Sequence, residues 1–205
     1  MIERNYGILT SIDWNSFQWQ AESSPADISH SNYGYVIENG ITFTFLNFGH
    51  EIYPTDEKGY YRGLVPQLWS REPDKDKVRY VEIVFMKSQN WQDKQNYIVG
   101  FYAFPIFGKC NMPSPVPSFP REFELNVKAF PNDIHLLENY INLTAHPELQ
   151  SAILPKGKLL GKQGYNYLTK ENVFKILDIM TTLNPTDVRL KGIKYRVIQS
   201  ISSKR

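Results

Sequence analysis

The stretch from Val81 to Pro105, VEIVFMKSQNWQDKQNYIVGFYAFP, holds two apolar runs on either side of a polar loop. The runs Val81–Met86 and Tyr97–Phe104 are rich in β-branched and aromatic residues and have the length of buried strands. We therefore expect two core strands side by side. A loop that only joins strands is short and favours Gly or Asn-Gly, whereas this one is longer and carries Trp91. The loop is therefore a candidate functional element.

Strand patterns recur on both sides of this pair. We expect further strands at residues 6–12, 41–48 and 122–130. In the second of these, apolar residues alternate with Thr42 and Thr44, as in a strand with one buried face. Gly100 lies inside the second core strand, where a glycine predicts a bulge or a close approach by another backbone.

The last third of the chain has a helical pattern. Thr169 is a candidate N-cap for a helix that ends before Pro185. The apolar residues of this helix recur at helical spacing: Val173, Ile176, Leu177 and Met180. A second, weaker helix is expected at residues 133–143. Unevenly spaced strands together with a few helices predict an α+β fold around a strongly curved sheet or a small twisted β-barrel.

Composition and charge limit the class of protein. The chain has 205 residues, enough for one substantial core, and its net charge of +2 is too small to coat phosphate by bulk charge. Any contact with nucleic acid must therefore come from a local patch. The single cysteine, Cys110, fits a reducing compartment. We expect a cytoplasmic protein, because there is neither a signal-peptide pattern nor an apolar run of the roughly 18 residues that span a bilayer.

No motif in the sequence requires catalysis, a metal or a cofactor. The four histidines are scattered and Cys110 has no CxxC partner, so a zinc site is not expected. Residues 157–164, GKLLGKQG, differ from a phosphate loop in the spacing of the glycines and in having Gln after the lysine. We predict no enzyme activity and no cofactor. The lysines of this region fit a solvated turn and a phosphate contact equally well; they are Lys156, Lys158 and Lys162.

Aromatic side chains in polar segments are the remaining signal. All four tryptophans, Trp14, Trp19, Trp69 and Trp91, lie in or beside polar stretches, and SNYGY places Tyr33 and Tyr35 around Gly34. Any one tryptophan is more often a core residue than a binding residue. Several on the loops of one β-rich domain instead favour an aromatic pocket, which can hold an extruded base between π-faces while polar groups read its edge.

These segments resemble the EVE and YTH branches of the PUA-like superfamily. In that family a hydrophobic strand leads into a Ser-x-Asn turn and then into a strand with "IVG"; here the residues are 85–90, FMKSQN, followed by Ile98-Val99-Gly100. SNYGY looks like the segment in which YTH-type readers place a cage aromatic. With GYYRGLVPQLW at 59–69 and KGKLLGKQGYNYLTKENVFKIL at 156–177, the chain also resembles the N-terminal specificity domains of archaeal McrB-type modification-dependent restriction systems.

The resemblance implies a small twisted β-barrel of PUA-like fold with peripheral helices, spanning residues 1–182, and a C-terminal extension or linker at 183–205. It implies a non-enzymatic module that binds DNA, or RNA, and recognises a modified, flipped base. The NTPase motor and the nuclease of a restriction complex would then be its partners, since the chain has no Walker A motif of its own. YTH readers favour Trp in the cage, whereas this segment offers Tyr33 and Tyr35.

Two sets of residues follow as candidates. The base pocket is expected to contain Trp14, Tyr33, Tyr35, Ser88, Asn90 and Trp91, with the serine and asparagine reading the base edge. Phosphate contacts are expected from Lys87, Lys94, Lys156, Lys158 and Lys162. The alternative is a protein-interaction module that uses the same aromatics and the proline-rich segment at 111–122 as an interface. A hydrolase is a third, less favoured alternative, because no nucleophile–base pair is identifiable.

Overall fold

The computed structural model describes residues 4–65, 75–113, 122–154 and 164–204 and has two β-sheets. The larger sheet has the strand order β7-β4-β3-β1-β8, and the smaller has the order β2-β6-β5. The larger sheet consists of β1 (Gly7–Ser11), β3 (Ile83–Gln89), β4 (Asn96–Ala103), β7 (Ile134–Asn142) and β8 (Tyr165–Leu168). The smaller sheet consists of β2 (Tyr61–Gly63), β5 (Ile106–Pro113) and β6 (Glu122–Ala129). Within the described residues neither sheet closes into a barrel, so the α+β class is confirmed and the barrel is not.

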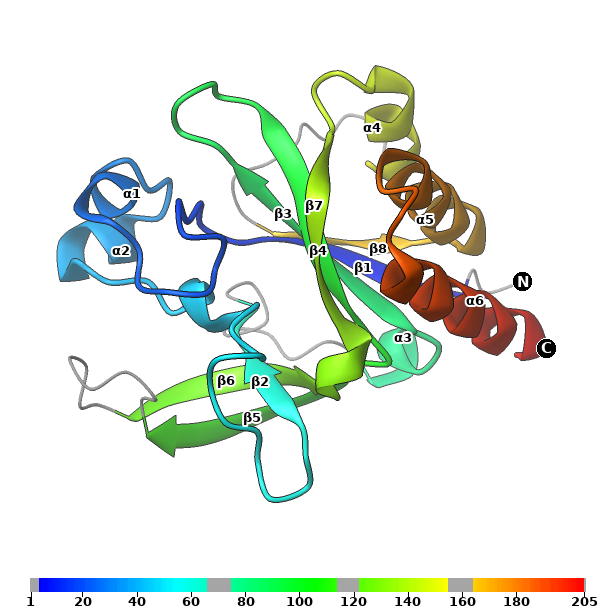
Figure 1. The fold of residues 1–205 in the computed structure, drawn as a ribbon, viewed down its shortest axis with the longest axis horizontal. Helices are drawn as coiled ribbons and strands as arrows, with labels where there is room; N and C mark the ends of the chain where they lie inside the picture. Colours follow the sequence, from blue (N-terminus) through cyan, green and yellow to red (C-terminus); the bar gives the residue numbers. More distant parts are fainter. Residues whose placement is uncertain (1–3, 66–74, 114–121, 155–163, 205) are drawn as a thin grey trace.

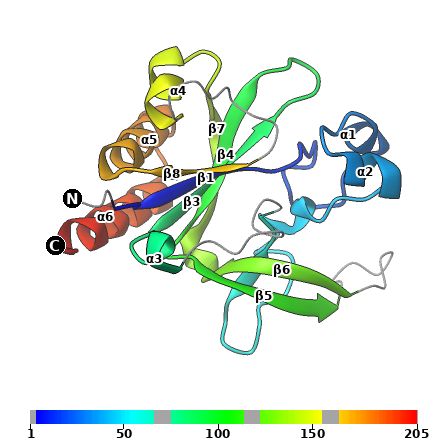
Figure 2. The same cartoon turned by 180° about the vertical axis from the view of Figure 1, so that it is seen from behind.

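The helices form two groups at opposite ends of the molecule. One group contains α4 (Pro147–Ile153), α5 (Lys170–Leu183) and α6 (Val188–Ser203), and the other contains α1 (Pro25–Ser29) and α2 (Gly34–Asn39). Both views show α4–α6 on one side of the large sheet and α1–α2 at the opposite end of the molecule (Figure 1, Figure 2). Three short helical segments complete the described elements: α3 (Lys75–Val78), η1 (Thr44–Leu46) and η3 (Pro131–Asp133).

The large sheet is the middle layer between two hydrophobic cores. Alternate residues of β3 point to opposite faces, as the pleat of a strand requires. Phe85 packs in the core shared with α4, α5 and α6, whereas Val84 packs in the core shared with the small sheet. Both are fully buried. The near-continuous apolar run that predicted this strand reflects burial on both faces.

The predicted core strands and the role of Gly100 are confirmed. β3 and β4 pair antiparallel, with a register shift after Met86, and β4 shifts again against β7 between Ile98 and Gly100. A Cβ atom at Gly100 would lie 2.4 Å from the His135 carbonyl oxygen, so only glycine allows the β7 backbone to approach so closely. The strands predicted at 6–12 and 122–130 are also confirmed, as β1 and β6.

Two predicted elements are wrong. Residues 41–48 contain the 3₁₀ segment η1 instead of a strand, and both Thr42 and Thr44 are buried. The Thr42 hydroxyl donates to the Asp13 carboxylate, 3.0 Å away. Thr42 was predicted to lie on the solvent face of a strand, and it instead forms a buried hydrogen bond. Residues 133–143, predicted as helix, mostly form β7, because pairing with β4 places this segment at the edge of the large sheet.

The helix predicted after Thr169 is confirmed as α5. The Thr169 hydroxyl accepts a hydrogen bond from the Asn172 amide, and the four predicted apolar residues are all buried. The segment after residue 182, predicted as an extension or linker, contains α6. Four of its side chains join the core formed by α5 and the large sheet: Leu190, Ile193, Val197 and Ile201.

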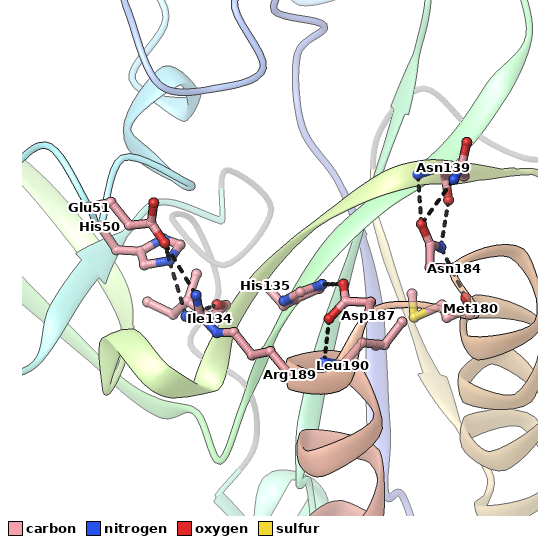
Figure 3. A network of polar contacts seen from close by, with 10 residues as sticks. All are labelled: His50, Glu51, Ile134, His135, Asn139, Met180, Asn184, Asp187, Arg189 and Leu190. Atoms are coloured by element: carbon pink, nitrogen blue, oxygen red, sulfur yellow. Dashed lines mark hydrogen bonds and ion pairs between the residues drawn. The ribbon is translucent and has the colours of Figure 1, made fainter.

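Polar contacts fix the start of α6 to the rest of the molecule (Figure 3). Asp187 caps the helix by accepting from the Leu190 amide at 2.8 Å, and its other carboxylate oxygen lies 2.8 Å from His135 Nε2 on β7. The Arg189 guanidinium donates to the carbonyl oxygens of Pro131 and Ile134 and pairs with Glu51 at 3.2 Å. We call these contacts the α6 clasp. Among the described residues, no helix combines the length and apolar character needed to cross a membrane.

Candidate functional site

A small pocket lies beyond the carboxyl ends of the parallel strands β1 and β3. Strand order places these two strands side by side, with Ser11 opposite Lys87. Crevices at the carboxyl ends of parallel strands are common ligand sites. The pocket has a volume of about 100 Å³. It is lined by Ser11, Ile12, Asp13, Trp14, Asp27, His30, Ser31, Asn32, Tyr33, Lys87, Gln89, Trp91 and Asn96.

Asp27 attaches the α1 segment to the tip of the β3–β4 hairpin. Its carboxylate forms a capping box with Ser24 at the start of α1 and accepts from the Ser16 hydroxyl at 2.7 Å. The Trp91 indole N–H donates to the same carboxylate at 2.9 Å. Burial by itself raises the pKa of Asp27, but hydrogen bonds from Ser16, Trp91 and Ser24 outweigh it and lower the pKa. Asp27 therefore remains an anion that holds one wall of the pocket in place.

Trp91 forms that wall together with His30. The two rings are stacked, with centroids 4.5 Å apart and planes 15° from parallel. His30 comes directly after α1, and Trp91 belongs to the turn between β3 and β4. The stack and the Asp27 bond together fix the orientation of an indole that is only partly buried. Such a fixed aromatic surface can bind a flat ligand without first losing side-chain entropy.

Trp14 belongs to a second aromatic group at the pocket. Its ring meets the fully buried Trp19 edge-to-face at 5.5 Å and lies 6.1 Å from Tyr97. Trp19 in turn donates its indole N–H to the Asp13 carbonyl at 2.7 Å, which fixes the chain that follows β1. Trp14 itself is partly exposed and lines the pocket. The buried tryptophan supports the one that is available to a ligand.

Asp13 is a second buried carboxylate at the pocket. It accepts hydrogen bonds from the hydroxyls of Ser31, at 2.5 Å, and Thr42, at 3.0 Å. Burial raises the pKa of Asp13 to about 6, against these two hydrogen bonds, which lower it. Because Ser31 follows α1 and Thr42 follows α2, the contacts hold the α1–α2 segment against the end of β1.

Lys87 and Ser11 line the pocket from neighbouring positions on β3 and β1. Lys87 is 4% exposed, and burial lowers the pKa of its ammonium group to about 8. Ser11 is 3% exposed, and its hydroxyl has no hydrogen-bond partner. The site therefore joins perturbed ionisable groups to aromatic walls in one cavity, a combination that is typical of functional sites.

The structure brings together only part of the predicted site. Trp14, Tyr33, Trp91 and Lys87 line the same pocket. Four predicted residues do not line it: Tyr35, Ser88, Asn90 and Lys94. Lys156, Lys158 and Lys162 lie outside the described residues.

Local contacts explain why the four residues lie elsewhere. Tyr35 is 57% exposed on α2. Ser88 is buried, and its hydroxyl donates to the Ile12 carbonyl at 3.0 Å. The Asn90 side chain accepts from the Gln92 amide within the hairpin turn, where Lys94 is exposed with a φ of 61°. The polar contacts of Ser88 and Asn90 are therefore made within the protein and away from the pocket lining.

The lining residues that the sequence analysis missed include Ser11, Asp13, Asp27 and His30. The one available signal was the polar pair Ser11 and Asp13 directly after the first predicted strand. That signal has meaning only once β1 is known to lie beside β3, a contact between segments more than 70 residues apart. Asp27 and His30 depend on the docking of α1 against Trp91, which no local pattern predicts.

A larger cleft of about 490 Å³ lies on the small sheet, between β2, β5 and the turn at 53–60. Its central carboxylate, Asp56, already pairs with Arg62 at 2.9 Å and Lys128 at 3.7 Å. The same carboxylate accepts from the amides of Lys58 and Tyr60 in the turn. These groups stabilise the turn, so the smaller pocket is the stronger candidate site.

No group of three or more potential metal ligands occurs among the described residues. Comparison with known proteins gives no relative: no family model, no curated protein and no solved structure matches this chain. The function must therefore be argued from the pocket itself.

Proposed function

We propose that the chain is a non-enzymatic nucleic-acid-binding module of PUA-like fold that takes one extruded base into the pocket. The observation that carries the proposal is a small cavity of about 100 Å³ that is lined by aromatic side chains, Trp14 and the Trp91–His30 stack, and by buried polar groups. A base offers two π-faces and a polar edge, and these are the surfaces that such a pocket complements.

The energies of stacking and extrusion are balanced. Stacking on an aromatic side chain stabilises a bound base by about 1–3 kcal/mol, and unstacking a base from a duplex costs a few kcal/mol. A base that is already weakly paired, or that carries an additional apolar methyl group, would therefore be bound preferentially. This balance favours a module that reads modified or mispaired bases over one that binds any duplex.

The proposed context is a McrB-type modification-dependent restriction system, with DNA favoured over RNA. The sequence segments at 59–69 and 156–177 support this part of the proposal by their resemblance to its specificity domains. The NTPase motor and the nuclease subunit of such a complex would be the partners.

Two tyrosines on either side of Gly34 give a matched test. Tyr33 lines the pocket, whereas Tyr35 lies outside it and is 57% exposed. Binding is measured by fluorescence polarisation with single- and double-stranded DNA and RNA, unmodified or methylated on adenine or cytosine, at two salt concentrations. We expect Tyr33→Ala to weaken binding of the preferred base about tenfold. Tyr35→Ala is expected to leave that binding within twofold of the unaltered chain.

Equal losses in the two variants would contradict a role for this pocket, and so would binding that is insensitive to the central base. Absence of binding in every format at low salt would instead favour the second candidate function, a protein-interaction module. The observation in its favour is that three large apolar side chains of the 16–40 segment are more than half exposed: Phe17, Tyr35 and Ile37. This alternative predicts association with a protein that depends on Tyr35 and Ile37 and that nucleic acid does not displace.

A further inference from the structure

The turn at residues 16–19 presents an aromatic side chain to solvent beside the pocket. Phe17 is 53% exposed. The residue before it, Ser16, donates to the Asp27 carboxylate from its amide at 3.0 Å and from its hydroxyl at 2.7 Å. Asp27 lines the pocket and accepts from the Trp91 indole at 2.9 Å. The turn that carries Phe17 is therefore bonded to the same carboxylate that holds one wall of the pocket.

A single buried side chain fixes the backbone of this turn. Asn15 is 2% exposed, and its side-chain oxygen accepts from the amides of Phe17, at 2.8 Å, and Trp19, at 3.0 Å. Its side-chain nitrogen donates to the Ala21 carbonyl at 2.9 Å and to the Ser23 hydroxyl at 3.0 Å. The position of Phe17 is thus set before any ligand binds, so binding does not have to order the turn.

The same turn contains backbone strain. Gln18 has a φ of 58° and Trp19 has a φ of 55°, in the left-handed region that side chains other than Gly, Asn and Asp avoid. Such strain lowers stability and is found mainly at functional sites. Trp19 is fully buried and holds the conformation, whereas more than half of Phe17 stays exposed. The packing of Phe17 within the protein therefore does not explain why this conformation is kept.

An exposed apolar ring beside a base pocket matches a defect that base extrusion creates. When one base leaves a duplex, the neighbouring base pair loses its stacking partner. Proteins that distort duplexes commonly insert an apolar side chain, Phe among them, between base steps. The link from Phe17 through Asp27 to the pocket wall favours a nucleic acid over a protein as the partner of this side chain.

We propose that Phe17 is a wedge that enters duplex DNA beside the extruded base and stacks on the base pair that this base has left. The inference rests on the proposed function and adds the residue that suits the chain to duplexes. It assigns different tasks to two groups of side chains. The pocket residues contact the extruded base, and Phe17 contacts the remaining stack.

The test measures binding by fluorescence polarisation to three forms of one DNA sequence. The first is a duplex with one mispaired base at its centre, cytosine or adenine, unmodified or methylated. The second is the same duplex with an abasic site at that position, and the third is the single strand that carries the base. We expect Phe17→Ala to weaken binding of both duplexes about tenfold, because both offer a gap in the stack. Binding of the single strand should stay within twofold.

Two control variants accompany Phe17→Ala. Phe17→Leu keeps an apolar wedge and should weaken binding of the duplexes less than about threefold. Ile52→Ala removes a side chain that is similarly exposed, at 59%, in the turn at 49–53 and outside the pocket lining. It should bind all three forms as the unaltered chain does. None of these variants should lower Tm, because each replaces a side chain that is already more than half exposed.

Tyr33→Ala separates the wedge from the proposed function. Tyr33 lines the pocket, so its loss should weaken only the forms that carry the base. If Tyr33→Ala binds every form as the unaltered chain does, no base enters the pocket and the proposed function fails. If Tyr33→Ala behaves as expected but Phe17→Ala leaves both duplexes unaffected, or weakens all three forms equally, only the wedge is overturned. Equal losses in Phe17→Ala and Ile52→Ala would overturn the wedge in the same way.

Discussion

At the scale of single residues, two buried serines make opposite contributions to stability. The Ser11 hydroxyl is unpaired, whereas the Ser88 hydroxyl is bonded to the Ile12 carbonyl at 3.0 Å. Burying a hydroxyl without a partner costs free energy, so we expect Ser11→Ala to leave the free energy of unfolding unchanged or raise it by about 1 kcal/mol. Ser88→Ala is expected to lower it by about 1–3 kcal/mol, because a buried carbonyl loses its donor. Urea denaturation of both variants checks the contrast, and a clear loss in Ser11→Ala would show that its hydroxyl is already satisfied.

Lys87 makes stability depend on pH in the alkaline range. Burial lowers the pKa of this lysine from 10.5 to about 8, so between these values the unfolded chain binds more protons than the folded chain. The contribution of Lys87 to the free energy of unfolding therefore rises as pH increases from 8 to 10.5, by about 3 kcal/mol at most. Lys87→Met removes this contribution, and its stability advantage over the unaltered chain should shrink across that window. Lys94→Met, at an exposed position, should follow the unaltered chain, and equal curves for all three proteins would contradict the prediction.

From sequence alone, a residue could be assigned to the pocket where the signal lies in its own local segment. Trp91, Trp14 and Tyr33 were identified because large aromatics in polar segments stand out without any knowledge of the fold. Ser88 and Asn90, which were predicted to read a base edge, do not line the pocket, because sequence does not show which side chains face a cavity. Ser88 and Lys87 are adjacent, yet Ser88 bonds to the backbone of Ile12, directly after β1, whereas Lys87 lines the pocket.

At the scale of elements, the α6 clasp stabilises the docking of the last helix. Asp187 both caps α6 and contacts His135, so Asp187→Ala removes a cap and leaves a buried imidazole without its acidic partner. We expect a loss of about 1–3 kcal/mol in the free energy of unfolding. The matched control is Asp178→Ala on α5. Its pair with Lys194 is at the surface, and such pairs contribute about 0–1 kcal/mol. Similar losses in both variants, measured by chemical denaturation, would contradict a special role for the clasp.

His50, which lies beside Arg189 of the α6 clasp, makes the stability of the fold sensitive to acid. Burial is the main cause that lowers the pKa of His50 from 6.5 to about 4, and the nearby Arg189 guanidinium is the second. Between these values the unfolded chain binds more protons, so the contribution of His50 to stability is lost as pH falls from 6.5 towards 4. Asp13 opposes this trend, because its pKa is raised to about 6 and the folded chain gains stability when it is protonated. Comparing thermal unfolding of the chain with that of His50→Gln isolates the histidine. The variant should lose less stability between pH 7 and pH 4, and a parallel loss would contradict the assignment.

Elements were predictable where pattern and tertiary context agree. In α5 the N-cap, the apolar stripe and the buried face agree, so the sequence was sufficient to predict this helix. β7 carries Ile134, Leu137 and Ile141 at helical spacing, yet it pairs with β4 at the edge of the sheet. Strand pairing satisfies the backbone of this segment through residues far away in the chain, which local spacing cannot reveal.

At the scale of the whole molecule, the pocket and the C-terminal helices occupy separate parts of the fold. The α4–α6 layer covers one face of the large sheet (Figure 1). The pocket lies where α1 meets the β3–β4 hairpin. Mutations in the clasp are therefore expected to change stability without changing the preference among bases. The net charge of only +2 means that affinity for phosphate must come from the position of a few lysines.

The contribution of particular lysines to phosphate binding can be tested through the salt dependence of binding. β8 begins at Tyr165, opposite Thr10 near the pocket end of β1, and the three lysines at 156, 158 and 162 precede it in sequence. Each phosphate contact contributes about 0.9 to the slope of log K against log salt on duplex DNA. If all three lysines contact phosphate, their replacement by Gln should reduce the slope by about 2–3 and weaken every oligonucleotide equally. The control variant replaces Lys175, Lys191 and Lys194 on α5 and α6 by Gln, with the same loss of charge. A similar reduction in both variants would mean that the overall charge of the molecule, and not these three lysines, governs its affinity for nucleic acid.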